Sequence, residues 1–574
     1  MDYLKEYTNW LSSSFIDENT KSELESISNN DNEIKERFYK NLEFGTGGLR
    51  GILGAGTNRM NIYTVRKATQ GLANYILNQG QEAVAKGVVI AHDCRRMSRE
   101  FCEESALVLN GNGIKTYIFD SLRPTPELSF AVRYLKCTAG IVITASHNPP
   151  EYNGYKVYWE DGGQTPYPRD EEIIAEVNQV SDFSQIKVAD RAEAEQQGLF
   201  LFAGHDVDDE FIKQVKSQCI NAEIIPESEL CVIYTPLHGT GNVPVRRALS
   251  EAGFKHVFVV PEQEKPDPDF STVSYPNPED PKVFALALKL AEEVNADIIT
   301  GTDPDADRVG VMVKDHNGGY VSLTGNMTGA ILTEYILSQK KAKNILPGNA
   351  AVISTIVSTD LTEQIASNYN AAYFNVLTGF KYIGAKIKEF EQSGSNTYQF
   401  GFEESYGSLP GTYARDKDAV AAALLICETA AWYAKQGKTL LDALEDIYKK
   451  YGYYKESVES ITLKGIQGIE DMKNIMAGLR QNPPSEVGGA AVTEVRDYQN
   501  SEIKYLSEGK AAPTDLPVSD VLYYVLADCS WFCVRPSGTE PKIKIYFGAK
   551  ADSHEAADKR LAELTEDVKK LINA

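Results

Sequence analysis

The stretch "ADIITGTDPDADRVG", residues 296 to 310, decides the fold class. In it an apolar, β-rich run ends in three aspartates at alternate positions. A second stretch, "GIVITASHNP" (140–149), has the same form, since an apolar run there stops at Ser146. Short β-rich runs of this kind alternate with helical segments over most of the chain. This alternation predicts an α/β protein with mainly parallel sheets.

The same patterns place individual elements. The runs expected to form buried strands are residues 87–93, 140–146, 230–236, 256–261, 296–303 and 350–357. Helical patterns predict helices over residues 64–79, 280–294 and 326–341.

A chain of 574 residues is longer than one hydrophobic core supports, so several domains are expected. Boundaries are indicated by polar or turn-rich segments at 193–210, 315–326 and 449–460. After the last of these, two β-rich arms and an amphipathic helix predict a smaller α+β domain. The expected domains are residues 1–205, 206–320, 321–453 and 454–574.

The overall charge is acidic. Lys and Arg number 58, Asp and Glu number 81, and the net charge is −23. This balance argues against nucleic acid and anionic membranes as partners. If the ligand is an anion, the cations that bind it must be concentrated in one cleft.

The cysteines and apolar segments indicate the compartment. Eight cysteines occur without a CxxC pair, which is typical of reduced core thiols in a cytosolic protein. The first residues are polar and acidic, unlike a signal peptide. The most apolar helical stretch, residues 419–434, is interrupted by Glu428 and is too short to span a bilayer. The sequence thus predicts a soluble, cytoplasmic protein with no membrane partner.

The aspartate loop carries the strongest chemical signal. In an extended loop, Asp303, Asp305 and Asp307 can turn three oxygen ligands toward one point, where they repel one another unless a cation neutralises them. Mg²⁺ suits such a site, because it takes oxygen ligands and leaves positions open for a phosphate. The alternative is a solvated acidic turn. Arg308, next to the trio, can bind an anion.

Ser146 has three candidate roles: a nucleophile, a holder of a metal or phosphate, and a helix cap at a strand end. If it carries a phosphoryl group, one phosphate oxygen can complete the metal sphere. The local candidates for balancing the charge of a phosphoserine are His147, Lys156 and Arg50. For His147, a hydrogen bond that orients the loop is an equal alternative to proton transfer.

Two further stretches place arginines near strand ends. The glycines of "FGTGGLRG" (44–51) lack dinucleotide-binding spacing and predict a loop whose N–H groups and Arg50 approach a phosphate. In "AHDCRRMS" (91–98), Arg95 is expected to form a structural ion pair rather than to bind a ligand.

The stretch "QFGFEESYG" (399–407) predicts a strand-to-helix turn that carries Glu403 and Ser405. A carboxylate and a hydroxyl together can bind vicinal sugar hydroxyls, although Ser405 can also act as a cap. Lys417 and Thr378 are expected on neighbouring loops.

The stretch "VRPSGTEPK" (534–542) predicts a tight turn between strands. Arg535, Ser537, Gly538 and Thr539 combine a guanidinium, two hydroxyls and free amides, which suit a tetrahedral anion. A plain β-turn is the alternative.

Four of these motifs, taken in order, resemble the α-D-phosphohexomutase family. They are "TASHNP" for a phosphoserine loop, "DPDADR" for a metal loop, "FEES" for a sugar loop and "RPSGTEP" for a phosphate loop. The resemblance covers nearly the whole chain. It implies four domains around a central cleft, the first three related mixed α/β domains and the fourth a smaller, mobile α+β domain.

The resemblance also implies a reaction. Phosphorylated Ser146 gives its phosphoryl group to a sugar phosphate, and the bisphosphorylated sugar reorients and returns its other phosphate to the serine. The implied cofactors are Mg²⁺ and glucose 1,6-bisphosphate, which is activator and intermediate. The implied metal ligands are Ser146, Asp303, Asp305 and Asp307.

Further roles are carried over by resemblance. The implied catalytic residues are Ser146, His147, Lys156 and Arg50. The residues implied to contact the sugar phosphate are Arg50, Asp307, Arg308, Thr378, Gly379, Glu403, Ser405 and Lys417. The phosphate that is not reacting is implied to bind Arg535, Ser537, Gly538 and Thr539.

The sugar loop departs from many relatives because no histidine follows Ser405, which leaves the general acid and base open. "EESYG" and the later "RDKD" resemble the glucose-type loop, so sugar phosphates of glucose are the expected partners. Pentose and mannose phosphates are the alternatives within the family. A non-catalytic sugar-phosphate-binding relative and a nicotinamide dehydrogenase are alternatives from other classes. The sequence does not indicate an oligomeric state.

Overall fold

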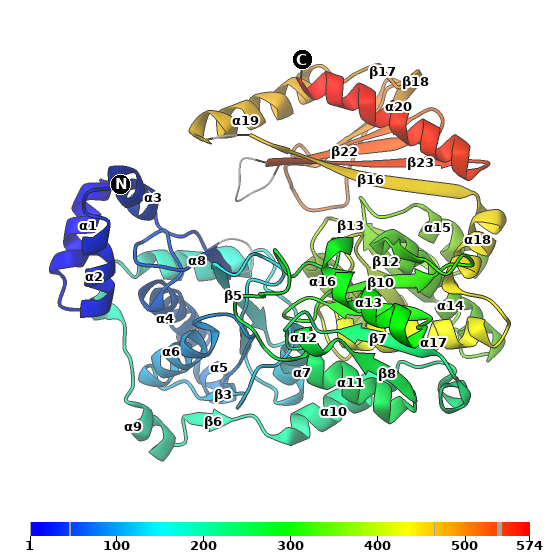
Figure 1. The fold of residues 1–574 in the computed structure, drawn as a ribbon. Helices are drawn as coiled ribbons and strands as arrows, with labels where there is room; N and C mark the ends of the chain where they lie inside the picture. The colour runs from blue at the N-terminus through cyan, green and yellow to red at the C-terminus, as the bar shows by residue number, and fades with distance from the viewer. Residues whose placement is uncertain (1, 45–47, 464, 537–541, 574) are drawn as a thin grey trace. The chain divides into compact units, whose positions relative to one another are not determined.

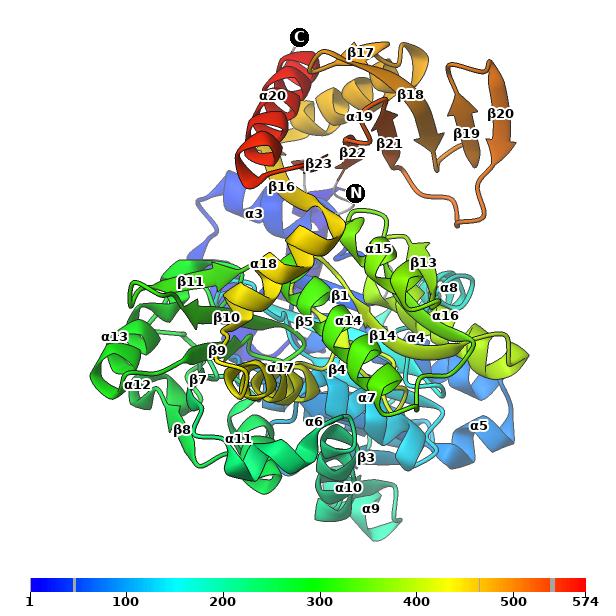
Figure 2. The same ribbon diagram turned by 90° about the vertical axis from the view of Figure 1, so that its right-hand side faces the viewer.

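The computed structural model of the chain (Figures 1 and 2) describes residues 2–44, 48–463, 465–536 and 542–573. The chain forms two compact units. The first consists of Met1–Thr324 and Phe380–Thr439, and the second of Gly325–Gly379 and Leu440–Ala574. Each unit is described by itself below.

The first unit contains a mixed six-stranded sheet in the order β1-β5-β4-β2-β3-β6. Its strands are β1 (Gly48–Ile52), β2 (Val88–His92), β3 (Thr116–Ile118), β4 (Ala139–Ile143), β5 (Tyr152–Trp159) and β6 (Phe200–Phe202). The pairs among β4, β2, β3 and β6 are parallel, whereas β5 runs antiparallel to β4 and to β1. Every residue of β2 and β4 is buried, as expected for strands covered on both faces.

Helices complete this core. They are α4 (Ile62–Asn78), α5 (Gln81–Lys86), α6 (Ser98–Gly111), α7 (Thr125–Tyr134), α8 (Arg169–Gln179) and α9 (Arg191–Gln196). Helix α4 begins with a capping box between Asn61 and Thr64, and its apolar side chains share one hydrophobic cluster with the sheet.

Three helices precede this sheet in the chain: α1 (Tyr3–Ser12), α2 (Glu18–Ser26) and α3 (Asp31–Phe38). Their apolar faces form a separate cluster that includes Trp10, Phe38 and Tyr63. Because Tyr63 belongs to α4, this cluster fixes the helices against the first sheet.

The first unit also contains a five-stranded sheet in the order β11-β10-β9-β7-β8. Its strands are β7 (Cys231–Thr235), β8 (His256–Val259), β9 (Ile298–Thr302), β10 (Val309–Lys314) and β11 (Tyr320–Leu323), and its helices are α10 (His205–Lys216), α11 (Asn242–Ala252), α12 (Pro261–Glu264) and α13 (Ala285–Val294). Strands β7, β8 and β9 are parallel, and β10 and β11 are antiparallel additions.

The remaining part of the first unit supplies two short strands and two helices. They are α16 (Phe380–Ser393), β14 (Thr397–Phe402), β15 (Ser408–Leu409) and α17 (Ala419–Ala434). Strands β14 and β15 pair antiparallel, and α17 packs against α10 and α11.

The second unit begins with an α/β segment. Its elements are α14 (Gly325–Ala342), β12 (Ala350–Thr355), α15 (Leu361–Asn368), β13 (Ala372–Val376) and α18 (Leu440–Tyr451). Strands β12 and β13 are parallel, and α14 packs against both α15 and α18.

The C-terminal part of the second unit is an antiparallel sheet packed against helices, which confirms the expected α+β character. Its elements are β16 (Tyr453–Thr462), α19 (Gly465–Gln481), β17 (Glu486–Val487), β18 (Ala490–Asp497), β19 (Glu502–Tyr505), β20 (Lys510–Pro513), β21 (Leu522–Leu526), β22 (Trp531–Pro536), β23 (Lys542–Ala551) and α20 (His554–Asn573). The helix α20 packs on β23 and β16.

Five of the six predicted strands, and the helices predicted over 64–79 and 326–341, are confirmed with small differences at their ends. The helix predicted over 280–294 consists of a 3₁₀ turn, Pro281–Phe284, followed by α13. The prediction that residues 256–261 form a buried strand is wrong, because the strand there, β8, lies at the edge of its sheet and Phe258 is 39% exposed. The turn-rich segment at 315–326 contains the turn between β10 and β11, which pair with each other.

None of the eight cysteines forms a disulfide, and Cys102, Cys137, Cys427 and Cys533 are buried as expected, whereas Cys529 is exposed. Within the described residues, no helix is both long enough and apolar enough to cross a membrane.

Helices α4 and α8 approach closely at Gly71. A Cβ atom there would lie 2.5 Å from the Cα of Val177, so Gly71→Ala should destabilise the first unit by about 1–3 kcal/mol although alanine favours helices. Gly478→Ala is the control, because that helical glycine of α19 has open space beside it, and it should not destabilise its unit. Differential scanning calorimetry measures both, and an unchanged first-unit transition in Gly71→Ala would contradict the close approach.

Candidate active site

Ser146 lies in the loop between β4 and β5, at the end of the buried strand. Its φ is +52°, in the left-handed region that is uncommon outside glycine, and its side chain is 3% exposed. The Ser146 N–H donates a hydrogen bond to Thr144 Oγ1 over 2.8 Å. Such a backbone persists only where its surroundings hold it in place.

Arg95 stabilises the conformation of this loop. Its guanidinium donates hydrogen bonds to the carbonyls of Ser146 (2.5 Å), Asn148 (2.5 Å), Pro149 (2.7 Å) and Tyr152 (3.1 Å). One side chain thus fixes the path of the whole turn.

Asp93 in turn fixes Arg95. The two side chains form a buried ion pair of 3.2 Å, and Asp93 also accepts hydrogen bonds from Thr144 and Ser98, both over 2.7 Å. The prediction that Arg95 forms a structural ion pair is confirmed.

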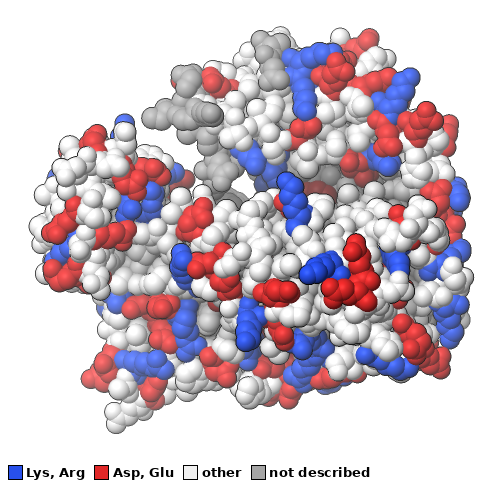
Figure 3. Space-filling model, viewed as in Figure 1, with Lys and Arg blue, Asp and Glu red and all other residues white. Residues whose placement is uncertain are grey.

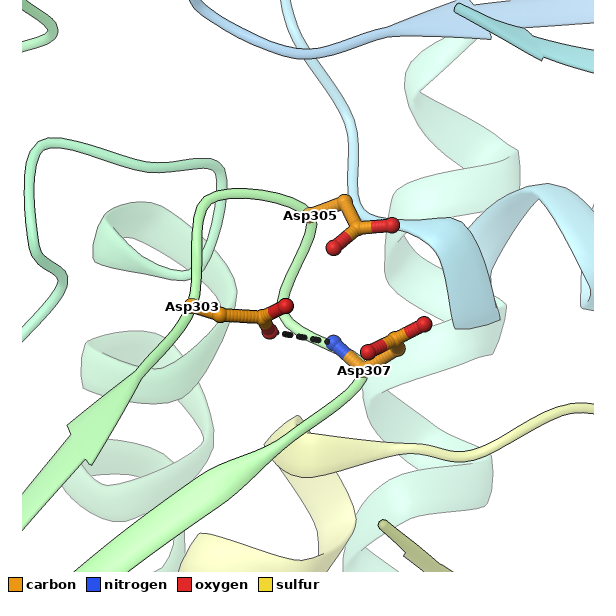
Figure 4. Close-up of side chains that lie close together, drawn as sticks. All are labelled: Asp303, Asp305 and Asp307. Carbon is orange, nitrogen blue, oxygen red and sulfur yellow. Dashed lines mark hydrogen bonds between the residues drawn. The ribbon is translucent and has the colours of Figure 1, made fainter. Parts of the chain in front are cut away.

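The aspartate loop follows β9. It is a tight turn rather than the extended loop expected from the sequence, and Ala306 has a φ of +51°. Asp303 causes the turn, since its Oδ1 accepts hydrogen bonds from the N–H groups of Asp307 (3.1 Å) and Arg308 (3.0 Å). Figure 4 shows the first of these bonds.

The three carboxylates of this loop converge (Figure 4). Asp303, Asp305 and Asp307 are all buried, and each offers one oxygen within 4.8 Å of the others. Oδ1 of Asp305 and Oδ1 of Asp307 have no hydrogen-bond partner among the described residues. Buried oxygens without a donor fit a bound cation, so the trio is a candidate metal site.

The other oxygens of the trio are bound by neighbouring side chains. Asp305 Oδ2 accepts hydrogen bonds from Thr125 and Lys156, both over 2.8 Å, and Asp307 Oδ2 lies 3.1 Å from the Lys417 ammonium. One oxygen of each of these carboxylates is therefore fixed while the second stays available.

Burial and neighbouring charges shift the pKa values of these carboxyl groups in opposite directions. Burial and repulsion by Asp305 and Asp307 raise the pKa of Asp303 well above its ordinary value. Burial also opposes ionisation of Asp307, but Lys417 and Lys156 outweigh it and hold the pKa of Asp307 below the ordinary value.

The structure brings Ser146 to this trio. The Ser146 hydroxyl donates a hydrogen bond of 2.7 Å to Asp303 Oδ2, although the two residues are 157 positions apart. Its Oγ also lies 3.2 Å from His147 Nδ1. Burial, Arg308 and Arg50 hold the pKa of His147 well below its ordinary value, so the imidazole is neutral at pH 7.

The sugar loop expected at 399–407 is a tight turn between the antiparallel strands β14 and β15. The predicted strand-to-helix turn is wrong, because the chain reverses through Tyr406, whose φ is +68°. Glu403 is buried in this turn and Ser405 is half-buried. The carbonyl of Tyr406 accepts a hydrogen bond of 3.1 Å from the N–H of Val309, which joins the turn to the aspartate loop.

Lys417 reaches the trio from the segment before α17. A Cβ atom at Gly407 would lie 2.8 Å from Lys417 Cγ, so the glycine leaves room for this side chain. The N–H of Ala419 donates to the carbonyl of Ala306 over 3.1 Å, which ties this segment to the aspartate loop as well.

Two arginines complete the cationic surroundings. Arg50 lies on β1 opposite Gly154 rather than on the expected loop, and donates a hydrogen bond of 3.3 Å to Asn148 Oδ1. Arg308 forms an ion pair with Glu279. On the face drawn in Figure 3, basic and acidic residues are interspersed, whereas the trio has Lys156 and Lys417 in direct contact.

The remaining predicted residues belong to the second unit or lie outside the described residues. Thr378 and Gly379 follow β13 in the second unit, where Gly379 has a φ of +121°. Arg535 lies on β22, paired with Lys544 of β23. Ser537, Gly538 and Thr539 lie outside the described residues.

Some contributors were missed from the sequence. Thr125 binds Asp305 from α7, and Glu279 pairs with Arg308, yet neither stands in a recognisable motif. Asp416 forms an ion pair of 3.2 Å with Lys417. Because Asp416 directly precedes Lys417, a predicted site residue, the sequence could have indicated its role.

Comparison with known proteins identifies the class. Family models match in order along the chain, described as phosphoglucomutase/phosphomannomutase alpha/beta/alpha domain I (residues 41–183), domain II (209–318), domain III (324–451) and the C-terminal domain (485–566). The chain belongs to the phosphoglucomutase/phosphomannomutase family, and it is therefore a phosphohexomutase, an enzyme of the isomerase class.

The chain is also similar to individual proteins of this family. A phosphoglucomutase of Staphylococcus aureus strain MRSA252 is 39% identical over 520 residues, which cover 91% of this chain and 92% of that one. The crystal structure of parafusin, a phosphoglucomutase from Paramecium, has a TM-score of 0.69 at 17% identity and covers 93% and 95% of the two chains. A phosphoglucomutase/phosphomannomutase family protein from Burkholderia thailandensis has a TM-score of 0.65 at 18% identity, covering 92% and 96%. These two structures share the fold.

Replacing Arg95 tests what holds the serine loop. Arg95→Met leaves Asp93 buried without its ion partner and removes the guanidinium donor from four loop carbonyls, so we expect the first unit to lose about 3–5 kcal/mol of stability. Arg96→Met is the control, because its ion pair with Asp269 is exposed and contributes about 1 kcal/mol or less. Calorimetry compares them, and equal shifts would contradict the role of Arg95.

Proposed function

We propose that the protein interconverts α-D-glucose 1-phosphate and glucose 6-phosphate through a phosphoserine at Ser146 and glucose 1,6-bisphosphate. The observation that carries this proposal is the 2.7 Å hydrogen bond from Ser146 to Asp303 within the buried trio. The glucose preference is supported by the "EESYG" turn and by relatives that are named phosphoglucomutase.

The phosphoryl group moves in two steps. In the first, a sugar hydroxyl attacks the phosphorus, the bond from phosphorus to Ser146 Oγ breaks, and the hydroxyl proton passes to a base. The Ser146 oxygen that leaves takes up a proton. In the second step, Ser146 Oγ gives up that proton and attacks the other phosphate of the bisphosphate, the bond from that phosphorus to the sugar oxygen breaks, and the sugar oxygen is protonated. The hydrogen bond from the Ser146 hydroxyl to Asp303 Oδ2 orients the serine oxygen beside the trio.

Mg²⁺ is the proposed metal. Asp303, Asp305 and Asp307 would hold it through oxygens such as the two unpaired Oδ1 atoms, and Ser146 would add a ligand through its phosphate. When bound, the ion supplies positive charge that stabilises the phosphate oxygens during transfer.

The surrounding side chains bind and orient the substrate. Lys156 and Lys417 stand beside the trio, where their charges can neutralise a phosphoryl group in transfer. His147, Arg50 and Arg308 are the proposed partners of the phosphate on the open side of the serine loop.

The sugar and the second phosphate need a further set of contacts. Glu403 and Ser405 are proposed to bind the sugar hydroxyls, together with Thr378 and Gly379. The phosphate that is not reacting is proposed to bind Arg535, Ser537, Gly538 and Thr539. The division into domains 1–205, 206–320, 321–453 and 454–574 stays a prediction.

The phosphoserine is tested by mass and by activity. Incubation with glucose 1,6-bisphosphate should add one phosphate that maps to Ser146, and Ser146→Ala should lose at least about 10³-fold in kcat because the carrier oxygen is gone. Ser105→Ala is the control, since that buried hydroxyl bonds Phe101 of α6 and Thr69 of α4, neither of which is a proposed site residue, and it should leave activity unchanged. Mutase activity that persists in Ser146→Ala would refute the mechanism.

The substrate is tested in the same assay. Glucose, mannose and pentose 1-phosphates are each supplied with the matching bisphosphate, and the glucose compound should give the highest kcat/KM. A higher value for the pentose compound would favour phosphopentose conversion, one of the alternatives within the family.

The metal is tested by calorimetric titration. Mg²⁺ should bind the purified protein, and Asp305→Asn should weaken that binding at least about tenfold, because one of three charged ligands is removed. Asp315→Asn is the control, since Asp315 lies in the exposed β10–β11 turn. Activity that survives thorough chelation, or equal affinities in the two variants, would contradict the metal role.

A further inference from the structure

A second cavity lies in the first unit, at the junction of the N-terminal helices with the first sheet. Its volume is 460 Å³, and it is lined by α1, by the segment before β1, by α4 and by the end of α8. This volume suits a small organic molecule. Ser146 and the aspartate trio do not line it, so it is separate from the proposed active site.

One wall of the cavity is aromatic. Trp10 and Tyr63 have ring centroids 5.4 Å apart, and Phe183 lies 5.8 Å from Trp10 and 5.6 Å from Tyr63. Phe44 adds a fourth ring to the lining. Trp10 meets Tyr63 and Phe183 edge to face, at interplanar angles of 74° and 77°, so this wall offers ring edges and partial faces to an aromatic ligand rather than one flat surface.

Lys67 of α4 is the cation of the cavity lining. It is half-buried and makes no hydrogen bond or ion pair with any described residue, and burial lowers its pKa. An ammonium in this position has lost part of its hydration without gaining a partner. An anionic group of a ligand would supply the missing partner.

Three carboxylates also line the cavity, and each has a nearby donor or cation. Glu43 pairs with Lys40 at 3.2 Å, and Asp182 caps a short helix through a 2.7 Å bond from the Ser184 N–H. Glu6 accepts a weak hydrogen bond from Asn9 over 3.5 Å. Burial lowers the pKa of Lys67 although the charge of Glu6 opposes this shift, and the two side chains form no direct ion pair. Among the described residues, the Lys67 ammonium is therefore the charged group of this lining that has neither a hydrogen bond nor an ion pair.

We propose that this cavity is a second ligand site, which binds a small aromatic anion. The ring lies against the wall formed by Trp10, Tyr63 and Phe183, and the anionic group pairs with Lys67. A carboxylate, a sulfonate and a phosphate monoester share this chemistry. Helix α1 lies before residue 41, where the family match begins, so one part of the lining comes from a segment that the family models do not include.

Two matched dyes test the proposal in the full-length protein. One is 8-anilinonaphthalene-1-sulfonate, and the other is N-phenyl-1-naphthylamine, which has the same rings without the sulfonate. The wild type should bind the sulfonate dye at one site and about tenfold more tightly than the neutral dye, the gain of one charge-assisted contact. Lys67→Met should remove this preference and leave the affinity for the neutral dye within about twofold.

Two further variants control for folding and for position. Lys35→Met alters an exposed lysine of α3 and should leave both affinities unchanged. Ala68→Leu adds volume to the cavity wall and should weaken both dyes at least about threefold. The melting temperature of each variant shows that it is folded. Competition by benzoate and by phenyl phosphate then distinguishes a carboxylate ligand from a phosphate ligand.

The proposal is overturned if Lys67→Met weakens both dyes equally or neither of them. It is also overturned if a folded Ala68→Leu variant binds both dyes as the wild type does. Because fluorescence reports binding without any sugar phosphate, these results are independent of the mutase assays.

Discussion

Mutual repulsion of three buried carboxylates is the constraint on which the rest of the site depends. Asp303, Asp305 and Asp307 each place an oxygen within 4.8 Å of the others, with little water to screen them. The protein offsets this repulsion with Lys156 and Lys417, and it leaves two oxygens for a cation. The acidic trio and its lysines are thus one electrostatic unit, whose net charge changes when a metal and a phosphate enter.

Backbone hydrogen bonds give this unit its geometry. The aspartate loop is joined to the turn after β14 through Val309 and to the segment before α17 through Ala306. The serine loop is held separately by Arg95, which donates to four of its carbonyls. Groups that come from distant parts of the chain are therefore fixed by main-chain contacts, which preorganises them for charged substrates.

Much of the fold could be predicted from the sequence, because buried strands and amphipathic helices leave a periodic pattern. The exception, β8, is apolar in sequence but lies at a sheet edge, and edge position depends on strand order, which periodicity does not contain. The residues of the site could be predicted because strand ends carry Ser146 and the aspartates in short motifs. Thr125 and Glu279 could not, since their roles arise only where distant segments meet. The sequence predicts a strand-to-helix turn at Tyr406, but a second short strand, β15, comes before the next helix, α17.

The left-handed backbone at Ser146 limits how this protein can evolve. A β-branched residue is strongly disfavoured at a φ of +52°, so threonine would keep the hydroxyl but strain the chain. Asparagine and glycine adopt that conformation easily but carry no phosphoryl acceptor. If Ser146 carries the phosphoryl group, as proposed, substitutions that fit this backbone abolish the transfer, whereas threonine, which keeps a hydroxyl, strains the backbone. Mutation at this position would then lead to inactive homologues rather than to a different phosphoryl carrier.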